Sequence, residues 1–334
     1  MAHLDWQEST GELRFRLSGL SGTILANGER FSVMGLEVPA VDAGGNPGGA
    51  GAPVRVGEPV MAPYRVLARD AWMGELRVMP HAAEPTETGL RVLWRPRLAH
   101  QAQVVLDVTP REPNILDFEF EVVGHRRYPG YEIIVSNYFA EGFTGGAYAR
   151  RDGVPAGGAE EPPQGELVRP SGDPVFSGMY VGFPRDEAAA NLMSDGRWQR
   201  GRSWTRFLAA RYYALPLGFF AQKSGPLDAV VMGLADDVAA VSMAYALEGT
   251  PDRVSRHNSL YLHLFGRDLA PGEAWRTRAR LVVGPFDRDA AAHRRLYEEF
   301  AQEAAALNRK PPVTIRTLAA LQDPVAADPG HQTS

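Results

Sequence analysis

The stretch LDFEFEVV, residues 116–123, carries the pattern that decides the fold. Successive side chains of a β-strand point to opposite faces, and here the apolar ones fall on alternate positions with acidic residues between them. The alternation predicts a strand with one face in a core and one polar face, as is typical of antiparallel sheets. The apolar positions are Leu116, Phe118, Phe120 and Val122.

Strand-like runs recur at short spacing on both sides of this stretch. Turn residues separate them, which is the pattern of an all-β chain. The clearest runs are YRVLARDAW, GLRVLWRPRL, QAQVVLDVTP, YEIIVSNYF, NSLYLHLFGRDL and AWRTRARLVVG. Their number, roughly 15, exceeds the strand count of an immunoglobulin-like module. We therefore expect one large antiparallel β-sandwich rather than two smaller domains, because no change in composition divides the strands.

Helical spacing is convincing in the C-terminal part, where an alanine-rich segment at about 287–309 predicts a helix. Asp287 is the expected N-cap of this helix. A shorter helix is expected at 184–196. The apolar face of the C-terminal helix consists of Ala292, Leu296, Phe300 and Ala304.

The expected domain covers residues 1–310, including the C-terminal helix. Residues 311–334 are polar and rich in proline, so we expect a flexible tail there. Residues 150–177 are rich in Gly, Pro and Glu and are expected to form a long surface excursion.

Composition limits the classes of function. The chain has 334 residues and a net charge of -5, so no basic field attracts nucleic acid. The absence of cysteine excludes disulfides, thiolate nucleophiles and cysteine-ligated metals. Neither a signal-peptide h-region nor an apolar run long enough to span a bilayer is visible, so we expect a soluble, cytoplasmic protein without a membrane partner.

One segment offers the residue types that recognise sugars. Aromatic faces stack on pyranose rings, and charged planar groups make paired hydrogen bonds to hydroxyls. The segment SDGRWQRGRSWTRF, residues 194–207, supplies both kinds of group. A core role for the tryptophans and a surface role for the arginines is the alternative. The candidate ligand-binding or catalytic residues here are Asp195, Arg197, Trp198, Arg202 and Trp204.

The stretch VSNYFAEGF, residues 135–143, adds two candidate ligand-binding residues, Asn137 and Tyr138. In a strand, Asn137 shares a face with Ile133 and Val135, so it needs either backbone partners or a ligand. The opposite face carries Glu132, Ile134 and Ser136.

Proton transfer needs titratable groups, and the candidates are His125, His81, Glu141 and Asp195. Arg127, beside His125, is a further candidate for ligand binding, although a solvated turn also explains this basic cluster. His263 is expected to be a hydrogen-bonded histidine within a sheet.

Neither a cofactor nor a metal is expected. A phosphate-binding glycine loop, a dinucleotide fingerprint and a nucleophile elbow are all missing from the sequence. His81 and Glu84 have metal-ligand side chains, but the sequence shows no third ligand.

Two stretches resemble a known family. NSLYLHLFGRDLAPGEAWRTRARLVVG resembles the terminal hairpin of galactose-mutarotase-like supersandwiches, and VSNYFAEGF resembles a segment of aldose 1-epimerases that reads Asn-His-x-Tyr-Phe-Asn-Leu. Asn137, Tyr138 and Phe139 match once a gap is allowed, while the histidine of that segment has no counterpart. SNYF, DGRW and LFGRDL also resemble uncharacterised bacterial proteins associated with carbohydrate degradation. The resemblance implies a β-supersandwich and a carbohydrate ligand.

Three functions follow as alternatives. The first is an enzyme that epimerises a sugar or cleaves a glycosidic bond, with His125 or His81 paired with Glu141 or Asp195. The second is a non-catalytic glycan-binding protein that uses the Trp and Arg platform. The third is a structural protein whose sheet faces bury a subunit interface. A homodimer is compatible with all three.

Overall fold

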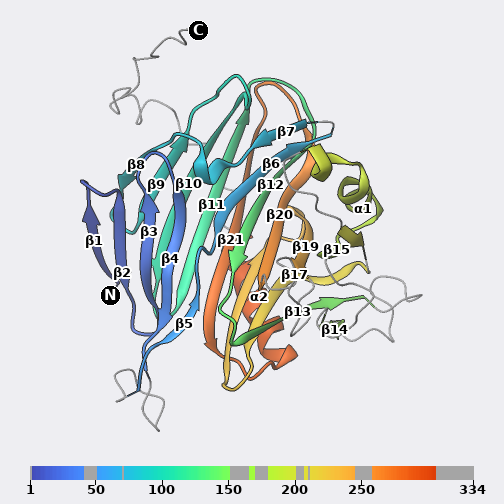
Figure 1. Cartoon of the computed structure of the whole chain (residues 1–334). Coiled ribbons are helices and arrows are strands. Elements are labelled where there is room, and N and C mark those ends of the chain that lie inside the picture. The colour runs from blue at the N-terminus through green and yellow to red at the C-terminus, as the bar shows by residue number, and fades with distance from the viewer. Residues whose placement is uncertain are drawn as a thin grey trace, which may run out of the picture.

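The structure is a computed structural model, shown in Figure 1. It describes residues 2–40, 51–69, 71–150, 165–169, 180–200, 207–209, 211–244 and 258–305. Within these ranges the chain forms three sheets, and pairing between strands is antiparallel except between β15 (Tyr180–Pro184) and β16 (Phe207–Ala209). The all-β sandwich expected from the sequence is confirmed.

The N-terminal sheet is a five-stranded meander in which each strand pairs with the next. It lies at one side of the molecule, in blue in Figure 1. Its strands are β1 (His3–Gln7), β2 (Glu12–Arg16), β3 (Ser21–Ala26), β4 (Phe31–Val38) and β5 (Val54–Gly57).

The second sheet has nine described strands in the order β14-β13-β17-β18-β21-β11-β10-β9-β8. In that order they are Glu166–Val168, Phe143–Ala149, Tyr213–Gln222, Leu227–Gly233, Ala274–Pro285, Ile115–Gly124, Ala102–Arg111, Leu90–Trp94 and Ala82–Pro85.

The third sheet has seven described strands in the order β16-β15-β19-β20-β12-β6-β7. They are Phe207–Ala209, Tyr180–Pro184, Val238–Ala244, Ser259–Leu269, Tyr128–Tyr138, Ala62–Ala68 and Ala71–Gly74. Two short 3-10 helices accompany this sheet, η1 (Leu76–Val78) and η3 (Arg197–Arg200).

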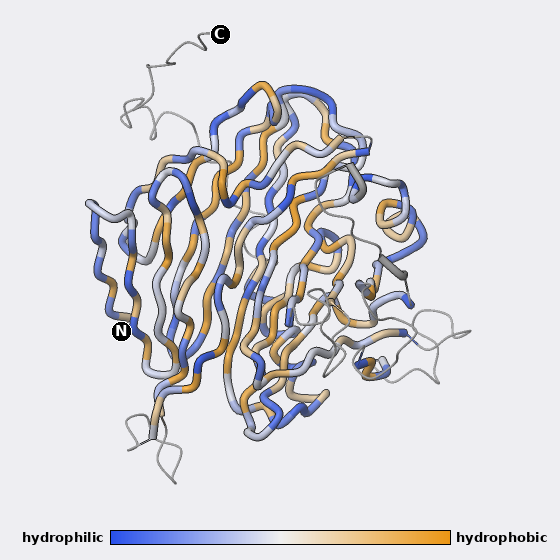
Figure 2. Tube along the Cα trace, viewed as in Figure 1, coloured by the Kyte–Doolittle hydropathy of each residue, from blue (hydrophilic) through white to orange (hydrophobic). Residues whose placement is uncertain are grey.

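The main core fills the space between the sheets. The apolar residues that alternate along the strands, as predicted from the sequence, point into it. Hydrophobic and hydrophilic positions alternate along many strands in Figure 2. The predicted apolar face of β11 is buried in this core. The acidic face of β11 is less exposed than expected, because Asp117 pairs with Arg280 across the strands at 2.6 Å. Glu121 pairs in the same way with Arg276.

The C-terminal helix α2 (Ala290–Ala305) covers the far side of the nine-stranded sheet. Phe300 and Ala304 are buried there in a second apolar cluster. The helix begins later than predicted: Asp289 caps it by accepting the Ala291 N–H at 2.9 Å. Asp287, the predicted cap, instead has a φ of 52° in the preceding turn, so that prediction is wrong.

A buried polar contact accompanies the apolar contacts of α2. His293 is hydrogen-bonded to Asp228 at 3.0 Å and to the Tyr148 hydroxyl at 2.9 Å. Burial raises the pKa of Tyr148, so its hydroxyl stays protonated and able to donate.

The shorter predicted helix is confirmed as α1 (Glu187–Ser194), where Asp186 accepts the Ala189 N–H. Residues 306–334, with the predicted tail, and most of 150–177 lie outside the described residues. Among the described helices, neither the length nor the apolar character needed to cross a membrane is found.

A pH-dependent test concerns Glu303, which ties α2 to the sheet. Its carboxylate accepts hydrogen bonds from Arg280 and Arg111, both at 2.7 Å, and the bond from Arg280 is the main reason that its pKa falls to about 2. A folded pKa below the unfolded one stabilises the protein above about pH 4.5, and this stabilisation is lost as the pH falls through the folded value.

We expect Glu303→Gln to lower the free energy of unfolding at pH 7 by about 1 kcal/mol, a modest value because the side chain is 41% exposed. The deficit should shrink as the pH falls from about 5 towards 2, measured by urea unfolding. Glu298→Gln, which breaks an exposed pair within α2, is the control and should have a smaller effect. A deficit that stays constant with pH would contradict the assignment.

Candidate functional site

The outer face of the seven-stranded sheet carries the candidate site. Along β12, Ile133 and Val135 point into the main core, as predicted. Ile134 points the other way, into a separate cluster with several aromatic side chains. This second face is polar as well as aromatic, because Glu132 and Ser136 share it and are buried.

A β-bulge aims two side chains of β6 at this face. Ile134 pairs with Arg65 and Val135 pairs with Pro63, which leaves Tyr64 as the extra residue. A bulge places two residues opposite one and re-aims their side chains. Tyr64 and Arg65 both contact aromatic rings of the outer face as a result.

Four tyrosines gather on this face, and we call them the tyrosine cluster: Tyr64, Tyr138, Tyr180 and Tyr261. Tyr261 is central, with Tyr64 stacked at 6.1 Å between ring centroids and Tyr138 perpendicular at 6.3 Å. The Tyr180 ring lies 5.4 Å away, and its hydroxyl oxygen is 3.4 Å from that of Tyr261. Burial, with the neighbouring tyrosines, raises the pKa of Tyr261 well above its ordinary value, so its hydroxyl stays neutral.

Two arginines lie against the tyrosine cluster, and we call Arg65 and Arg77 the arginine pair. The guanidinium carbon of Arg65 is 4.7 Å from the Tyr64 ring centroid and 5.0 Å from that of Trp198. The guanidinium of Arg77 lies 4.2 Å from the same Tyr64 ring and is paired with Glu75 at 2.9 Å. Cation–π contacts of this kind hold each guanidinium in a defined orientation.

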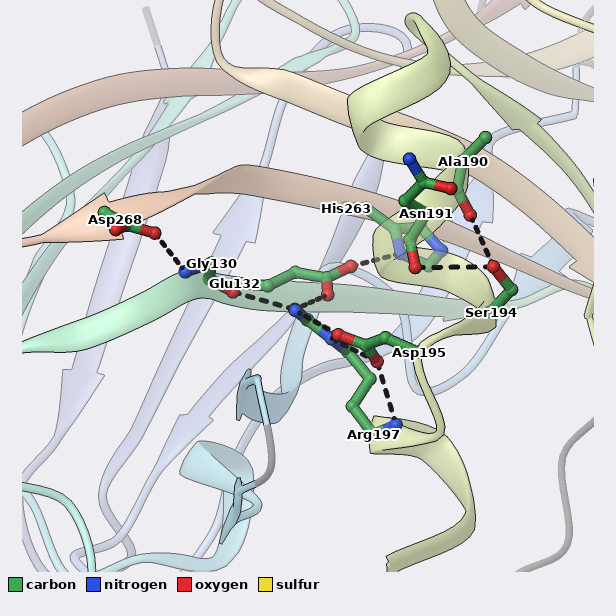
Figure 3. Close-up of polar contacts among 9 residues, drawn as sticks. All are labelled: Gly130, Glu132, Ala190, Asn191, Ser194, Asp195, Arg197, His263 and Asp268. Carbon is green, nitrogen blue, oxygen red and sulfur yellow. Dashed lines mark hydrogen bonds and ion pairs between the residues drawn. The ribbon is translucent and has the colours of Figure 1, made fainter.

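A buried chain of polar contacts lies on the same face as the tyrosine cluster, and Figure 3 shows its members Glu132, His263, Arg197 and Asp195. One oxygen of Glu132 is 2.5 Å from Nδ1 of His263, and the other accepts a hydrogen bond from Nη1 of Arg197 at 2.9 Å. Nε2 of His263 is 2.7 Å from the hydroxyl of Ser242. The chain therefore runs across three neighbouring strands, β12, β20 and β19, and reaches η3 through Arg197.

Arg197 fastens η3 to the sheet. Its Nη1 also donates to the carbonyl of Gly130 at 2.7 Å, and its Nε and Nη2 bind the Asp195 carboxylate at 3.1 and 2.9 Å. A Cβ on Gly130 would lie 2.8 Å from the Arg197 guanidinium, so the approach requires glycine there. Trp198 follows directly and rests on His263, with 5.7 Å between ring centroids.

Among these polar contacts, the attraction between opposite charges offsets the free-energy cost of burying each charge. Burial alone raises the pKa of Glu132, but the hydrogen bonds and charges of His263 and Arg197 outweigh it and lower the pKa overall. The carboxylate is therefore ionised and has both oxygens occupied. The carboxylate therefore has a structural role, which is to hold His263 and Arg197 in place. It has little capacity to exchange a proton with a ligand.

The structure brings four of the predicted site residues together. Asp195, Arg197 and Trp198 close over the outer face, and Tyr138 belongs to the tyrosine cluster. Trp198 is buried within the cluster that contains Ile134, which is the position that the core alternative expects of this tryptophan. Arg202 and Trp204 lie outside the described residues.

Asn137 is on the opposite face from the site. Its side-chain oxygen accepts the Met61 N–H at 2.9 Å, and its side-chain nitrogen donates to the Leu260 carbonyl at 3.2 Å. The backbone partners weighed from the sequence are therefore present, and the amide ties β12 to the chain on both sides.

His125, Arg127 and Glu141 flank β12 at its two ends. The strand has 11 residues and so spans roughly 33 Å at about 3.3 Å per residue. His125 and Arg127 are exposed before it, where Arg127 contacts Asp268 at 3.3 Å, and Glu141 is exposed after it. The structure does not bring His125 and Glu141 to one sugar ring, because the whole length of β12 separates them.

His81 has structural partners in another part of the fold. Its Nδ1 contacts the Met79 carbonyl at 2.9 Å, and its Nε2 is 3.3 Å from the Gly28 nitrogen. Burial lowers the pKa of His81, which favours a neutral ring that donates to Met79 and accepts from Gly28. Among the described residues, three or more metal-ligand side chains do not meet at one point.

Several residues of this face were missed or were not assigned to a site from the sequence. The expectation that His263 is a hydrogen-bonded sheet histidine is confirmed, but its link to Glu132 was not foreseen. The available signal was the alternation in SLYLHL, which puts Tyr261 and His263 on one face and the leucines on the other. The other missed residues are Tyr64, Arg65, Arg77, Tyr180 and Ser242.

Comparison with known proteins gives similarities of structure. Neither a protein-family model nor the sequence of a curated protein matches this chain. An aldose epimerase homologue from C. elegans matches with a TM-score of 0.46 and 11% identity, over 80% of this chain and 96% of that one. A galactose 1-epimerase from Lactobacillus acidophilus matches with a TM-score of 0.41 and 10% identity, over 85% of this chain and 98% of that one.

The galactosidase domain of an α-galactosidase–sucrose kinase matches with a TM-score of 0.48 and 11% identity, over 85% of this chain. This chain spans 42% of that structure, which is less than half its length. The resemblance of the sequence to galactose-mutarotase-like proteins is therefore matched by a similarity of structure. This similarity concerns the fold.

The buried polar contacts of Glu132 lead to a prediction about the stability of the protein. Glu132→Gln removes the negative charge between Arg197 and His263, and breaking a buried pair on one side costs about 3–5 kcal/mol. Urea unfolding should show this loss in the free energy of unfolding. The control is Glu12→Gln, which removes a solvent-accessible contact to Arg14 and should cost less than about 1 kcal/mol. Similar losses for both variants would show that Glu132 does not hold the site together.

Proposed function

We propose that this protein binds a carbohydrate on the outer face of the seven-stranded sheet. The observation that carries the proposal is the tyrosine cluster, in which four strands each contribute one tyrosine to a single face. A phenol ring offers an apolar surface to the C–H groups of a sugar ring, while its hydroxyl can bond to a sugar hydroxyl. Several such rings at one place suit a ligand that is both apolar on its faces and polar at its rim.

Exposure suggests how the ligand would lie. Tyr64, Tyr138 and Arg77 are half-buried and accessible, whereas Tyr180 and Tyr261 are buried beneath them. The accessible rings would contact the sugar, and the buried tyrosines would fix the orientation of those rings. The guanidinium groups would donate paired hydrogen bonds to vicinal hydroxyls.

Sugar epimerisation or glycoside cleavage is the second candidate, and one contact favours it. Glu132 behind His263 is an arrangement by which a carboxylate orients a histidine for proton transfer. Nε2 of His263 faces Ser242, so a proton would pass through that hydroxyl. Glu132 and Asp195, the two carboxylates that contact Arg197 beside the tyrosine cluster, are both engaged by that arginine, which favours binding over catalysis.

Binding is tested on a variant of the accessible ring. We expect Tyr138→Ala to raise the dissociation constant of a saccharide at least about tenfold, since removal of a well-placed aromatic contact costs about 1.4 kcal/mol or more. Calorimetric titration with mono- and oligosaccharides measures this, after a thermal-shift screen of the wild type has found the ligand. Tyr212→Ala, at a tyrosine that is 40% exposed in another part of the chain, is the control and should bind normally.

Two outcomes count against the proposal. One is a wild-type protein whose melting temperature is unchanged by every saccharide tested. The other is a Tyr138→Ala protein with wild-type affinity. A faster exchange of sugar anomers in NMR spectra with the wild type, lost in His263→Gln, would transfer support from binding to catalysis.

A further inference from the structure

Arg77 lies over an aromatic ring, and one of its terminal nitrogens is not used in that arrangement. Its Nε and Nη2 both approach one oxygen of Glu75, at 2.9 Å, and its ring contact is to Tyr64. Its side chain is 24% exposed, and Nη1 has no hydrogen-bond or ion-pair partner within the described part of the chain. The result is an oriented donor at the accessible rim of the tyrosine cluster.

A second guanidinium adds positive charge at the same ring. Arg65 lies 4.7 Å from the Tyr64 centroid, and its Nη2 donates to the Tyr64 hydroxyl at 2.8 Å. Two guanidinium groups and the Glu75 carboxylate lie at this ring, so these three groups together carry one positive charge, whereas the whole chain has a net charge of -5. Opposite charge at a partly buried site attracts ligands more strongly than it would in bulk water.

Three arginines of the nine-stranded sheet use their ion pairs differently. Arg276, Arg278 and Arg280 each face a carboxylate directly across the strands of the nine-stranded sheet. Those guanidinium groups lock two strands together. Glu75 lies two positions from Arg77 on the same segment, so their contact joins no strands and instead sets the direction of the guanidinium.

We propose that the site takes an acidic saccharide, whose uronate carboxylate binds Arg77 while its ring rests on the accessible Tyr138. This proposal rests on the proposed carbohydrate binding and names the class of ligand. A planar guanidinium matches a carboxylate better than an ammonium does, because its N–H groups form a rigid fork. Arg65 contributes charge at the ring of Tyr64 and favours an anion over a neutral sugar.

The test compares matched ligands by calorimetric titration. D-Galacturonate and its trisaccharide are titrated beside D-galactose and its trisaccharide, at low salt and at about 0.5 M salt, where exposed charges are largely screened. The acidic ligands should bind at least about tenfold more tightly than the neutral ones at low salt, and the difference should narrow at high salt.

Variants of Arg77 separate the contribution of its charge to binding from the contribution of its packing. Arg77→Gln should weaken binding of the galacturonate ligands at least about tenfold and binding of the neutral ligands by a clearly smaller factor, while Arg77→Lys should fall between it and the wild type. If Arg77→Gln fails to fold, Arg77→Lys carries the test, because it keeps the charge and loses the fork. Arg91→Gln removes an arginine that pairs with Asp107 in the other main sheet, and it should leave both ligand series unaffected.

The outcomes distinguish this inference from the proposal beneath it. Neutral sugars that bind as tightly as acidic ones, or an Arg77→Gln protein that keeps its affinity for galacturonate, overturn the acidic class and leave carbohydrate binding intact. Binding of none of the sugars overturns both.

Discussion

Both oxygens of the Glu132 carboxylate are bound inside the protein, and the candidate site depends on them. One oxygen contacts His263 on the adjacent strand β20, and the other holds Arg197, which brings η3 against the sheet. Trp198 follows Arg197 and is thereby set against His263. Because a buried charge without a partner is costly, these groups stabilise one another only as a set. One carboxylate thus connects strand pairing to the segment that closes the outer face.

In each of the two main sheets, the face that points away from the main core is also buried. The side chains that bury it differ between the two sheets. On the nine-stranded sheet, α2 supplies an apolar surface through Phe300 and Ala304. On the seven-stranded sheet, the buried outer face contains the tyrosine cluster, the arginine pair and the chain from Ser242 to Arg197. Polar groups at that density are expensive to bury unless each has a partner. Their concentration on one face is the physical reason for the proposal that a ligand binds there.

Sequence patterns predicted elements better than they predicted partners. The alternation in residues 116–123 predicted the strand and its core face, and the helical spacing near the C-terminus predicted α2. Asp117 was expected to face solvent, yet it is buried against Arg280, 163 positions away. The segment that begins at Ser194 was identified from its residue types alone, whereas the link between Glu132 and His263 depends on the pairing of β12 with β20. Such pairing lies between distant parts of the chain and leaves no local signal.

The sequence by itself determined the all-β class and the side-chain face of many strand positions, because alternation is a local property of the extended backbone. The tertiary structure alone decided which strands are neighbours. Tyr64, Tyr138, Tyr180 and Tyr261 come from four separate strands and meet only after β6, β12, β20, β19 and β15 have paired. A bulge in β6 was also needed to turn Tyr64 and Arg65 toward them. Strand order depends on the burial of the whole core at once, and for that reason no short stretch of the chain can specify it.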